Sequence, residues 1–220
     1  MDEGKLRSVA VIRFASAFLV LAATFFGTAG TLRYWEAWLF MATILLPMMI
    51  AVFYFLRRAP EILKMRMEMR EDRSNQKAIQ WVGALVWLPM FLIPGFDHRC
   101  GWSTVPGPVV LLAEFMVFTG YLIIFLTLRE NRFASRTIQV EEDQIVITSG
   151  PYSLVRHPMY VGALLMLLPA PLALGSYWAM IPALLVPALV ALRIVDEEEL
   201  LIEALPGYRK YAEEVKYRLI

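Results

Sequence analysis

Two polar clusters in the last third of the chain have residue types that could bind a small charged ligand. The first, at 149–162, reads Ser-Gly-Pro-Tyr-Ser-Leu-Val-Arg-His-Pro-Met-Tyr-Val-Gly, and the second, at 193–201, reads Arg-Ile-Val-Asp-Glu-Glu-Glu-Leu-Leu. The 35 residues between His157 and Arg193 include no charged side chain. If they fold back as an apolar hairpin, both clusters meet on one side of a membrane. An active site at a membrane surface needs that arrangement.

Arg193 and Glu197 are four residues apart, so on a helix they share one face. An ion pair that shields both charges near lipid is the simpler interpretation of such a spacing. The three consecutive glutamates at 197–199 are harder to explain in this way, because the inner leaflet of a membrane is usually anionic and disfavours acidic residues. A small cationic ligand would account for them.

His157 stands directly before Pro158, and a lone histidine of this kind is more often structural than catalytic. The proline favours an extended residue before it and fits the first turn of a helix, whose free N–H groups suit a ligand carboxylate. Gly150 opens a Gly-Pro turn that lets the backbone approach a ligand closely. The other histidine, His98, lies far away in the sequence, and Cys100 is the single cysteine, so we expect no metal site.

The elements that must position these clusters are membrane helices. The chain is 59% hydrophobic with a mean hydropathy of +0.56, above the roughly 45–50% apolar content of soluble domains. Three charge-free runs, and a fourth run whose one charged residue is Glu114, approach the ~20 residues that a spanning helix needs, and two arms form the C-terminal hairpin. We therefore expect an all-α integral membrane protein with about six transmembrane arms, at 14–32, 37–56, 78–96, 109–128, 160–170 and 177–195.

The segments between the arms have their own predictions. The charged stretch at 57–77 suits an interfacial helix and a solvated loop about equally, and 97–108 has the turn residues of an external loop. Glu114 falls in the fourth arm, near its outer end, where we expect it at the interface. The β-branched run that follows Gln144 predicts an extended segment, and 196–217 predicts an interfacial helix.

We divide the chain into N-terminal transmembrane helices at 1–128 and a cofactor-binding region at 129–220. The first apolar run has no clear cleavage signal after it, so we interpret it as a retained helix. With a cytoplasmic N-terminus and six alternating arms, 19 of the 21 Lys and Arg residues fall on the cytoplasmic side. This asymmetry predicts a multi-pass protein whose two polar clusters face the cytoplasm.

Several common sites are missing from the sequence. There is no GxGxxG, no GxxxxGK[ST] and no GxSxG motif. Basic residues alternate with acidic ones, so nothing favours nucleic-acid binding.

The two clusters together resemble the isoprenylcysteine carboxyl methyltransferase family and its bacterial and archaeal relatives, and phospholipid N-methyltransferases share the C-terminal pattern. The similarity covers about 137–217 and includes a third segment, Leu-Pro-Gly-Tyr-Arg-Lys-Tyr at 205–211. It implies S-adenosylmethionine in a cytoplasmic pocket under the membrane domain. Arg193 would face the substrate, and Glu197 would contact the cofactor. The cofactor-binding residues that the resemblance implies, or that the physical argument adds, are Gln139, Gln144, Ile145, Val146, Ile147, Gly150, Tyr152, His157, Pro158, Met159, Tyr160, Glu197 and Glu198.

The physical chemistry of methyl transfer agrees with these assignments. The sulfonium and ammonium of S-adenosylmethionine are complemented by Glu197 and its neighbours. In-line displacement neutralises the sulfonium, so positioning and the exclusion of water can supply most of the acceleration. A carboxylate acceptor needs no general base, and Arg193 could hold it, whereas an amine must lose its proton before it attacks.

The acceptor remains open: a lipophilic or membrane-delivered carboxylate of the isoprenylcysteine type leads, before a phospholipid amine or a small thiol. Two other classes compete. An NADPH-dependent sterol-type reductase carries a similar Arg-His-Pro-x-Tyr segment, but the glutamates of 197–199 would repel a phosphorylated nicotinamide cofactor. A non-catalytic membrane scaffold with a decayed pocket is the third.

Overall fold

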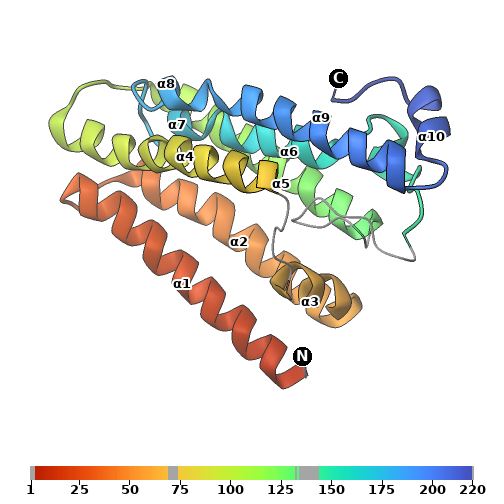
Figure 1. The fold of residues 1–220 in the computed structure, drawn as a ribbon. Helices are drawn as coiled ribbons and strands as arrows, with labels where there is room; N and C mark the ends of the chain where they lie inside the picture. Colours follow the sequence, from red (N-terminus) through yellow and green to blue (C-terminus); the bar gives the residue numbers. More distant parts are fainter. Residues whose placement is uncertain (1–2, 69–73, 132, 134–143, 220) are drawn as a thin grey trace.

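The computed structural model describes residues 3–68, 74–131, 133 and 144–219, and all regular structure within them is helical. Three helices are long and apolar enough to cross a membrane (Figure 1). This confirms the expected all-α class with apolar membrane helices, while the count of six arms and the division at residue 128 stay predictions. The three helices are α1 (Glu3–Ala29), α2 (Trp35–Arg58) and α5 (Gly107–Glu130).

Two further helices pack against this group. The helix α4 (Ser74–Cys100) packs alongside α1, and the short α3 (Pro60–Glu68) follows α2. The helical interpretation of the charged stretch is therefore correct for 60–68, where Ile62 and Leu63 are buried against the end of α2. Glu114 is buried among the helices and only 5% exposed, and its expected place near the membrane interface stays a prediction.

The apolar hairpin is present, but each of its arms extends beyond the predicted bounds and is broken into two helices. Its first arm consists of α6 (Pro158–Leu167) and α7 (Ala170–Ala173), and its return begins with α8 (Met180–Ala183). The turn between them includes Gly175 at φ +74°, a left-handed conformation that favours glycine. The return helix α9 (Val186–Ala204) continues beyond the predicted arm and carries the glutamates of 197–199 as helical residues.

Two predicted boundaries are wrong. The helix α4 continues through Asp97 to Cys100, so the external loop begins at Gly101. The C-terminal segment is two helices rather than one, because α9 ends at Ala204 and α10 (Tyr208–Glu214) starts anew. Between them Pro206 has no N–H to continue the helix, and Gly207 takes φ +87°.

Two glycines bring α5 and α6 into close contact. A Cβ added at Gly162 would lie 2.7 Å from the carbonyl oxygen of Gly120, and one added at Gly120 would lie 2.5 Å from the carbonyl oxygen of Gly162. Real Cβ atoms essentially never come this close, so the crossing requires glycine on both helices. It fixes the start of α6 beside the C-terminal half of α5.

At the start of α5 lies a polar network that we call the closed end: Tyr34, Asp97, Ser103, Leu174 and Ser176. Asp97 is fully buried and accepts hydrogen bonds from Ser103 N (2.7 Å), Ser103 Oγ (2.6 Å) and Ser176 Oγ (2.5 Å). Tyr34 donates to the carbonyl of Leu174 at 2.5 Å. The closed end thus ties the hairpin turn to the loop before α5.

Candidate active site

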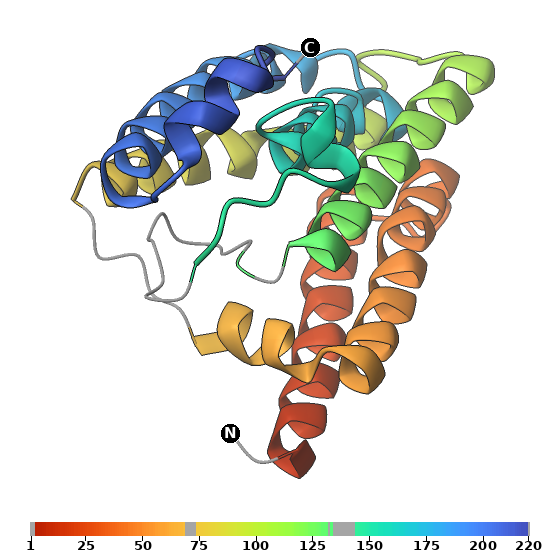
Figure 2. The same cartoon turned by 90° about the vertical axis from the view of Figure 1, so that its right-hand side faces the viewer.

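A hollow lies at the opposite end of α5, beyond Glu130. It is partly open to solvent, with about 860 Å³ of empty space that includes this open part, and both polar and apolar side chains line it. Figure 2 shows the segment 144–153 running between the end of α5 and the C-terminal helices α9 and α10. These segments and the start of α6 supply the lining.

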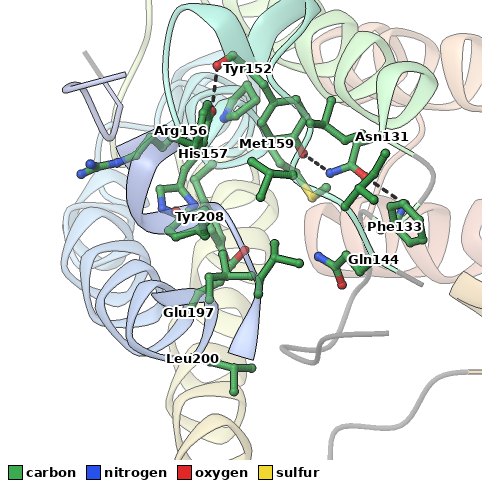
Figure 3. A pocket seen from close by; sticks show the side chains of 18 of the residues that line it. Asn131, Phe133, Gln144, Tyr152, Arg156, His157, Met159, Glu197, Leu200 and Tyr208 are labelled. Carbon is green, nitrogen blue, oxygen red and sulfur yellow. Dashed lines mark hydrogen bonds between the residues drawn. The ribbon is translucent and has the colours of Figure 1, made fainter. Parts of the chain in front are cut away.

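The hollow brings the two predicted clusters together. Eleven of the predicted residues line it, and they come from three separate segments of the chain (Figure 3). The apolar hairpin therefore returns the second cluster to the first, as expected. The eleven residues are Gln144, Ile145, Val146, Ile147, Tyr152, His157, Pro158, Met159, Tyr160, Arg193 and Glu197.

The hydroxyl of Tyr160 joins both predicted catalytic residues. It donates a hydrogen bond to Glu197 Oε2 at 2.6 Å and accepts one from Arg193 Nε at 2.9 Å. The expected common face of Arg193 and Glu197 on one helix is thus realised, with a tyrosine from α6 between them. Because the Tyr160 proton is directed at Glu197, the geometry keeps that carboxylate in place beside the hollow.

Glu198 is in a different position from the one predicted. It does not line the hollow, and it is only 4% exposed. Its Oε1 lies 3.2 Å from His157 Nε2 and 2.9 Å from Arg156 Nε, and its Oε2 accepts a hydrogen bond from Arg218 Nε at 2.7 Å. Consecutive residues of an α-helix point about 100° apart, so Glu197 and Glu198 cannot face the same ligand.

The charges around Glu198 also set its protonation. Burial alone would raise the pKa of this carboxyl, but the hydrogen bond with His157 and the charges of His157, Arg156 and Arg218 outweigh burial and lower it. Glu198 therefore bonds to residues that frame the hollow and does not line the hollow itself.

The backbone after Thr148 shapes the hollow without lining it at every position. Gly150 takes φ +57°, as the predicted turn requires, but it faces Glu130 rather than the hollow. Glu130 also accepts a hydrogen bond from Ser149 Oγ. Gln139 lies outside the described residues, so its predicted role stays a prediction.

The start of α6 offers fewer backbone donors than predicted. Pro158 has no N–H, and the N–H groups of Tyr160 and Val161 both bond to the carbonyl oxygen of His157, at 3.0 and 3.2 Å. Those two donors are therefore not available to a ligand carboxylate. The tight first turn at His157 closes the Tyr160 bond, which an N-terminus would otherwise leave open, whereas the Val161 bond is the first regular bond of the helix.

Four lining residues with uncharged polar or aromatic side chains were not identified from the sequence: Asn131, Phe133, Tyr208 and Tyr211. The tyrosines have the three-residue spacing of one helix face, which could have revealed them. Tyr211 donates to the backbone carbonyl of Tyr152 at 2.7 Å, and burial raises its pKa to about 12. Asn131 had no signal beyond its position after a long apolar run. Arg156, Leu200, Leu201 and Leu205 complete the set that was missed.

The lining fits S-adenosylmethionine in its chemistry. A carboxylate from Glu197 can complement a cation, and the apolar side chains of 145–147 and four tyrosines line the remaining space. Among the described residues, no group of three or more His, Cys, Asp or Glu side chains could hold a metal ion.

Comparison with known proteins gives one family. Residues 108–206, a little under half of the chain, match the model of the phospholipid methyltransferase family. No curated protein matches the chain. The matched part runs from the start of α5 to the end of α9 and contains the α6 and α9 residues of the hollow. The match and the apolar helices indicate a membrane protein related to membrane methyltransferases.

Proposed function

We propose that this chain is an integral-membrane methyltransferase that transfers the methyl group of S-adenosylmethionine to a lipophilic or membrane-delivered acceptor. The observation that carries the proposal is the hydroxyl of Tyr160, which links Arg193 and Glu197 at one wall of the hollow. An acidic and a basic side chain are thereby presented together, inside the segment that matches a methyltransferase family.

Glu197 is assigned to the cofactor. When bound, S-adenosylmethionine supplies a methyl group on a positively charged sulfonium. The Glu197 carboxylate complements that charge, and the side chains of Ile145, Val146 and Ile147 provide an apolar wall that excludes water. An electrostatic contact of this kind gains strength in a site from which water is excluded.

Arg193 is assigned to the acceptor, and the acceptor class we favour is a carboxylate of the isoprenylcysteine type. As the new O–CH3 bond forms, the C–S bond breaks and its electron pair stays on sulfur, so no proton needs to be moved. Arg193 would hold the carboxylate in line, and positioning alone is a large source of rate acceleration. The positive charge of Arg193 would also repel a protonated amine that competes for the site.

A phospholipid amine is the second candidate, and the match to the phospholipid methyltransferase family favours it. Such an amine must be neutral when it attacks. Glu197, held by Tyr160 at 2.6 Å, is the carboxylate near enough to the hollow to accept its proton.

Labelled S-adenosylmethionine distinguishes these acceptors. Membranes that contain the protein are incubated with the methyl-labelled cofactor and one acceptor at a time. The three acceptors are a farnesylcysteine derivative, phosphatidylethanolamine and a small thiol. We expect base-labile label on the farnesylcysteine carboxylate, as for a methyl ester. Label on the phospholipid amine would favour the second candidate. Calorimetric binding of NADPH, with no binding of S-adenosylmethionine, would overturn the methyltransferase proposal in favour of a reductase.

We also propose that the hollow faces the cytoplasm. Cys100 is exposed at the other end of the bundle, as the last residue of α4, so it reports on the opposite side. In intact cells a membrane-impermeant maleimide should label Cys100. It should not label the thiol of a Ser153→Cys variant, made in a Cys100→Ser background, until the cells are opened. The reverse pattern would invert the orientation.

A further inference from the structure

Asn131, the residue directly after α5, makes two directional hydrogen bonds. Asn131 is the C-cap of α5, and its Nδ2 donates to the hydroxyl oxygen of Tyr152 at 3.0 Å. The backbone N–H of Phe133 donates to Asn131 Oδ1 at 2.9 Å. Figure 3 shows both bonds as one chain that runs from Phe133 through Asn131 to Tyr152 at the edge of the hollow.

The bond from Phe133 fixes which way the amide faces. A backbone N–H can only donate, so the atom opposite it must be the amide oxygen, and the NH2 group must point at Tyr152. The hydroxyl oxygen of Tyr152 is therefore used as an acceptor. Its single hydrogen must point away from Asn131.

Tyr152 is held so that this hydrogen is presented to the hollow. Its side chain lines the hollow, and its backbone carbonyl accepts the hydroxyl of Tyr211 at 2.7 Å. Burial raises the pKa of Tyr152, which keeps the proton on the hydroxyl. This hydroxyl donates no hydrogen bond to a protein acceptor among the residues that the structure describes.

We infer that Asn131 is a positioning residue, which makes Tyr152 a hydrogen-bond donor to an oxygen or nitrogen acceptor of the ligand in the hollow. The inference rests on the proposed function for the identity of that ligand. It adds an element that the two sequence clusters do not contain, because Asn131 belongs to the end of the preceding membrane helix. The C-terminal end of α5 therefore contributes to binding as well as to the fold.

Asn131→Asp tests the inference with almost no change in shape. At neutral pH the carboxylate would still accept from Phe133 N–H, but its second oxygen would accept the Tyr152 proton and withdraw it from the ligand. We expect the affinity for S-adenosylhomocysteine, measured by calorimetry in detergent at pH 7.5, to fall about tenfold. Tyr152→Phe should lose about as much. The double variant should lose no more than either single variant.

Acidification provides a readout that a merely structural role would not change. Once protonated, the carboxyl group that Asn131→Asp introduces carries one O–H donor and one carbonyl acceptor, as the amide of asparagine does. The ratio of wild-type to Asn131→Asp affinity should therefore shrink towards one as the pH is lowered, whereas the ratio for Tyr152→Phe should stay constant. The thermal midpoint of each variant without ligand controls for folding.

The outcomes separate two kinds of failure. If wild-type protein binds S-adenosylhomocysteine but Asn131→Asp binds it equally well, the inference is wrong and the proposed function stands. Additive losses in the double variant, or a pH-independent ratio for Asn131→Asp, also overturn the inference. If wild-type protein binds neither S-adenosylmethionine nor S-adenosylhomocysteine, the proposed function fails and the inference fails with it.

Discussion

The two ends of α5 hold polar side chains in opposite ways. At the closed end, Asp97 uses both carboxylate oxygens for three hydrogen bonds from two serines and is fully buried. At the other end, Glu197, Arg193 and Tyr152 stand around a hollow of about 860 Å³. Both groups join distant parts of the chain. Only the second leaves room for a ligand.

This difference shows how to recognise a site inside a membrane bundle. A buried polar cluster is costly unless its members are hydrogen-bonded, and the closed end meets that demand within the protein. The cluster around Tyr160 is hydrogen-bonded as well, but its side chains also line empty space. We therefore expect mutations at the closed end to affect stability alone, and mutations at the hollow to affect ligand affinity.

The largest expected effect is on stability at the closed end. Asp97→Ala removes the acceptor of three hydrogen bonds and leaves the buried hydroxyl of Ser176 without it. We expect a loss of about 3 kcal/mol in the free energy of unfolding, because a buried charged hydrogen-bond partner is removed. Thermal unfolding in detergent measures the loss. The affinity of the folded fraction for S-adenosylhomocysteine should be unchanged, and a weakened affinity would contradict the separation of the two ends.

A somewhat smaller effect is expected where α5 and α6 cross. Gly162→Ala would place a methyl group 2.7 Å from the carbonyl oxygen of Gly120, and overpacking of this kind costs about 2 kcal/mol. It should also lower ligand affinity, because the helix start at Pro158 must shift. Gly83→Ala on α4 is the matched control, since its added Cβ meets nothing within 4 Å. If both variants unfold at the same temperature, the close crossing is not required.

The effect on the hollow itself should appear in binding. Glu197→Gln keeps the shape and still accepts from Tyr160, but it removes the negative charge. We expect about a tenfold loss of affinity for S-adenosylmethionine, or about 1.4 kcal/mol, with an unchanged unfolding temperature. NADPH titration is the control, because removal of a carboxylate should not weaken binding of an anion. Unchanged affinity for S-adenosylmethionine would remove Glu197 from the cofactor site.

The smallest expected effect is a pH dependence from Glu198. Its pKa is lower in the folded protein than in the unfolded chain, so its stabilising contribution is present above the ordinary value of 4.5 and is lost as the pH falls through the folded value. As the pH falls below about 4.5, the unfolding temperature of the wild-type protein should fall, because this contribution is lost. Glu198→Gln should show a shallower fall over this range. An equal slope in both proteins would exclude Glu198 as the titrating group.

The sequence was most informative where the residue pattern was long or dense. The apolar runs predicted the membrane helices, and the charge-free stretch before Arg193 predicted that the two clusters would meet. Boundaries were less predictable. α4 continues through Asp97, whose buried carboxylate is satisfied by Ser103 in the next loop and by Ser176, 79 residues away, and a local turn pattern cannot reveal the second partner.

The site was predictable by segment but not by side-chain direction. Glu197 and Glu198 are adjacent and chemically identical, and only the rotation of α9 separates the one at the hollow from the one bound to Arg218. Asn131 could not be identified from the sequence for a related reason. Its importance comes from a hydrogen bond to Tyr152, 21 residues away.

The segment 217–218 has a practical consequence. The carbonyl oxygens of Tyr217 and Arg218 accept the backbone N–H groups of Arg156 and His157, at 2.9 and 3.0 Å, beside the guanidinium that reaches Glu198. A shortened form that ends before Tyr217 would lose both of these backbone hydrogen bonds to the His-Pro turn. We therefore expect that removal of this stretch by carboxypeptidase or trypsin during purification leaves the helices folded but Arg156 and His157 less firmly held at the hollow.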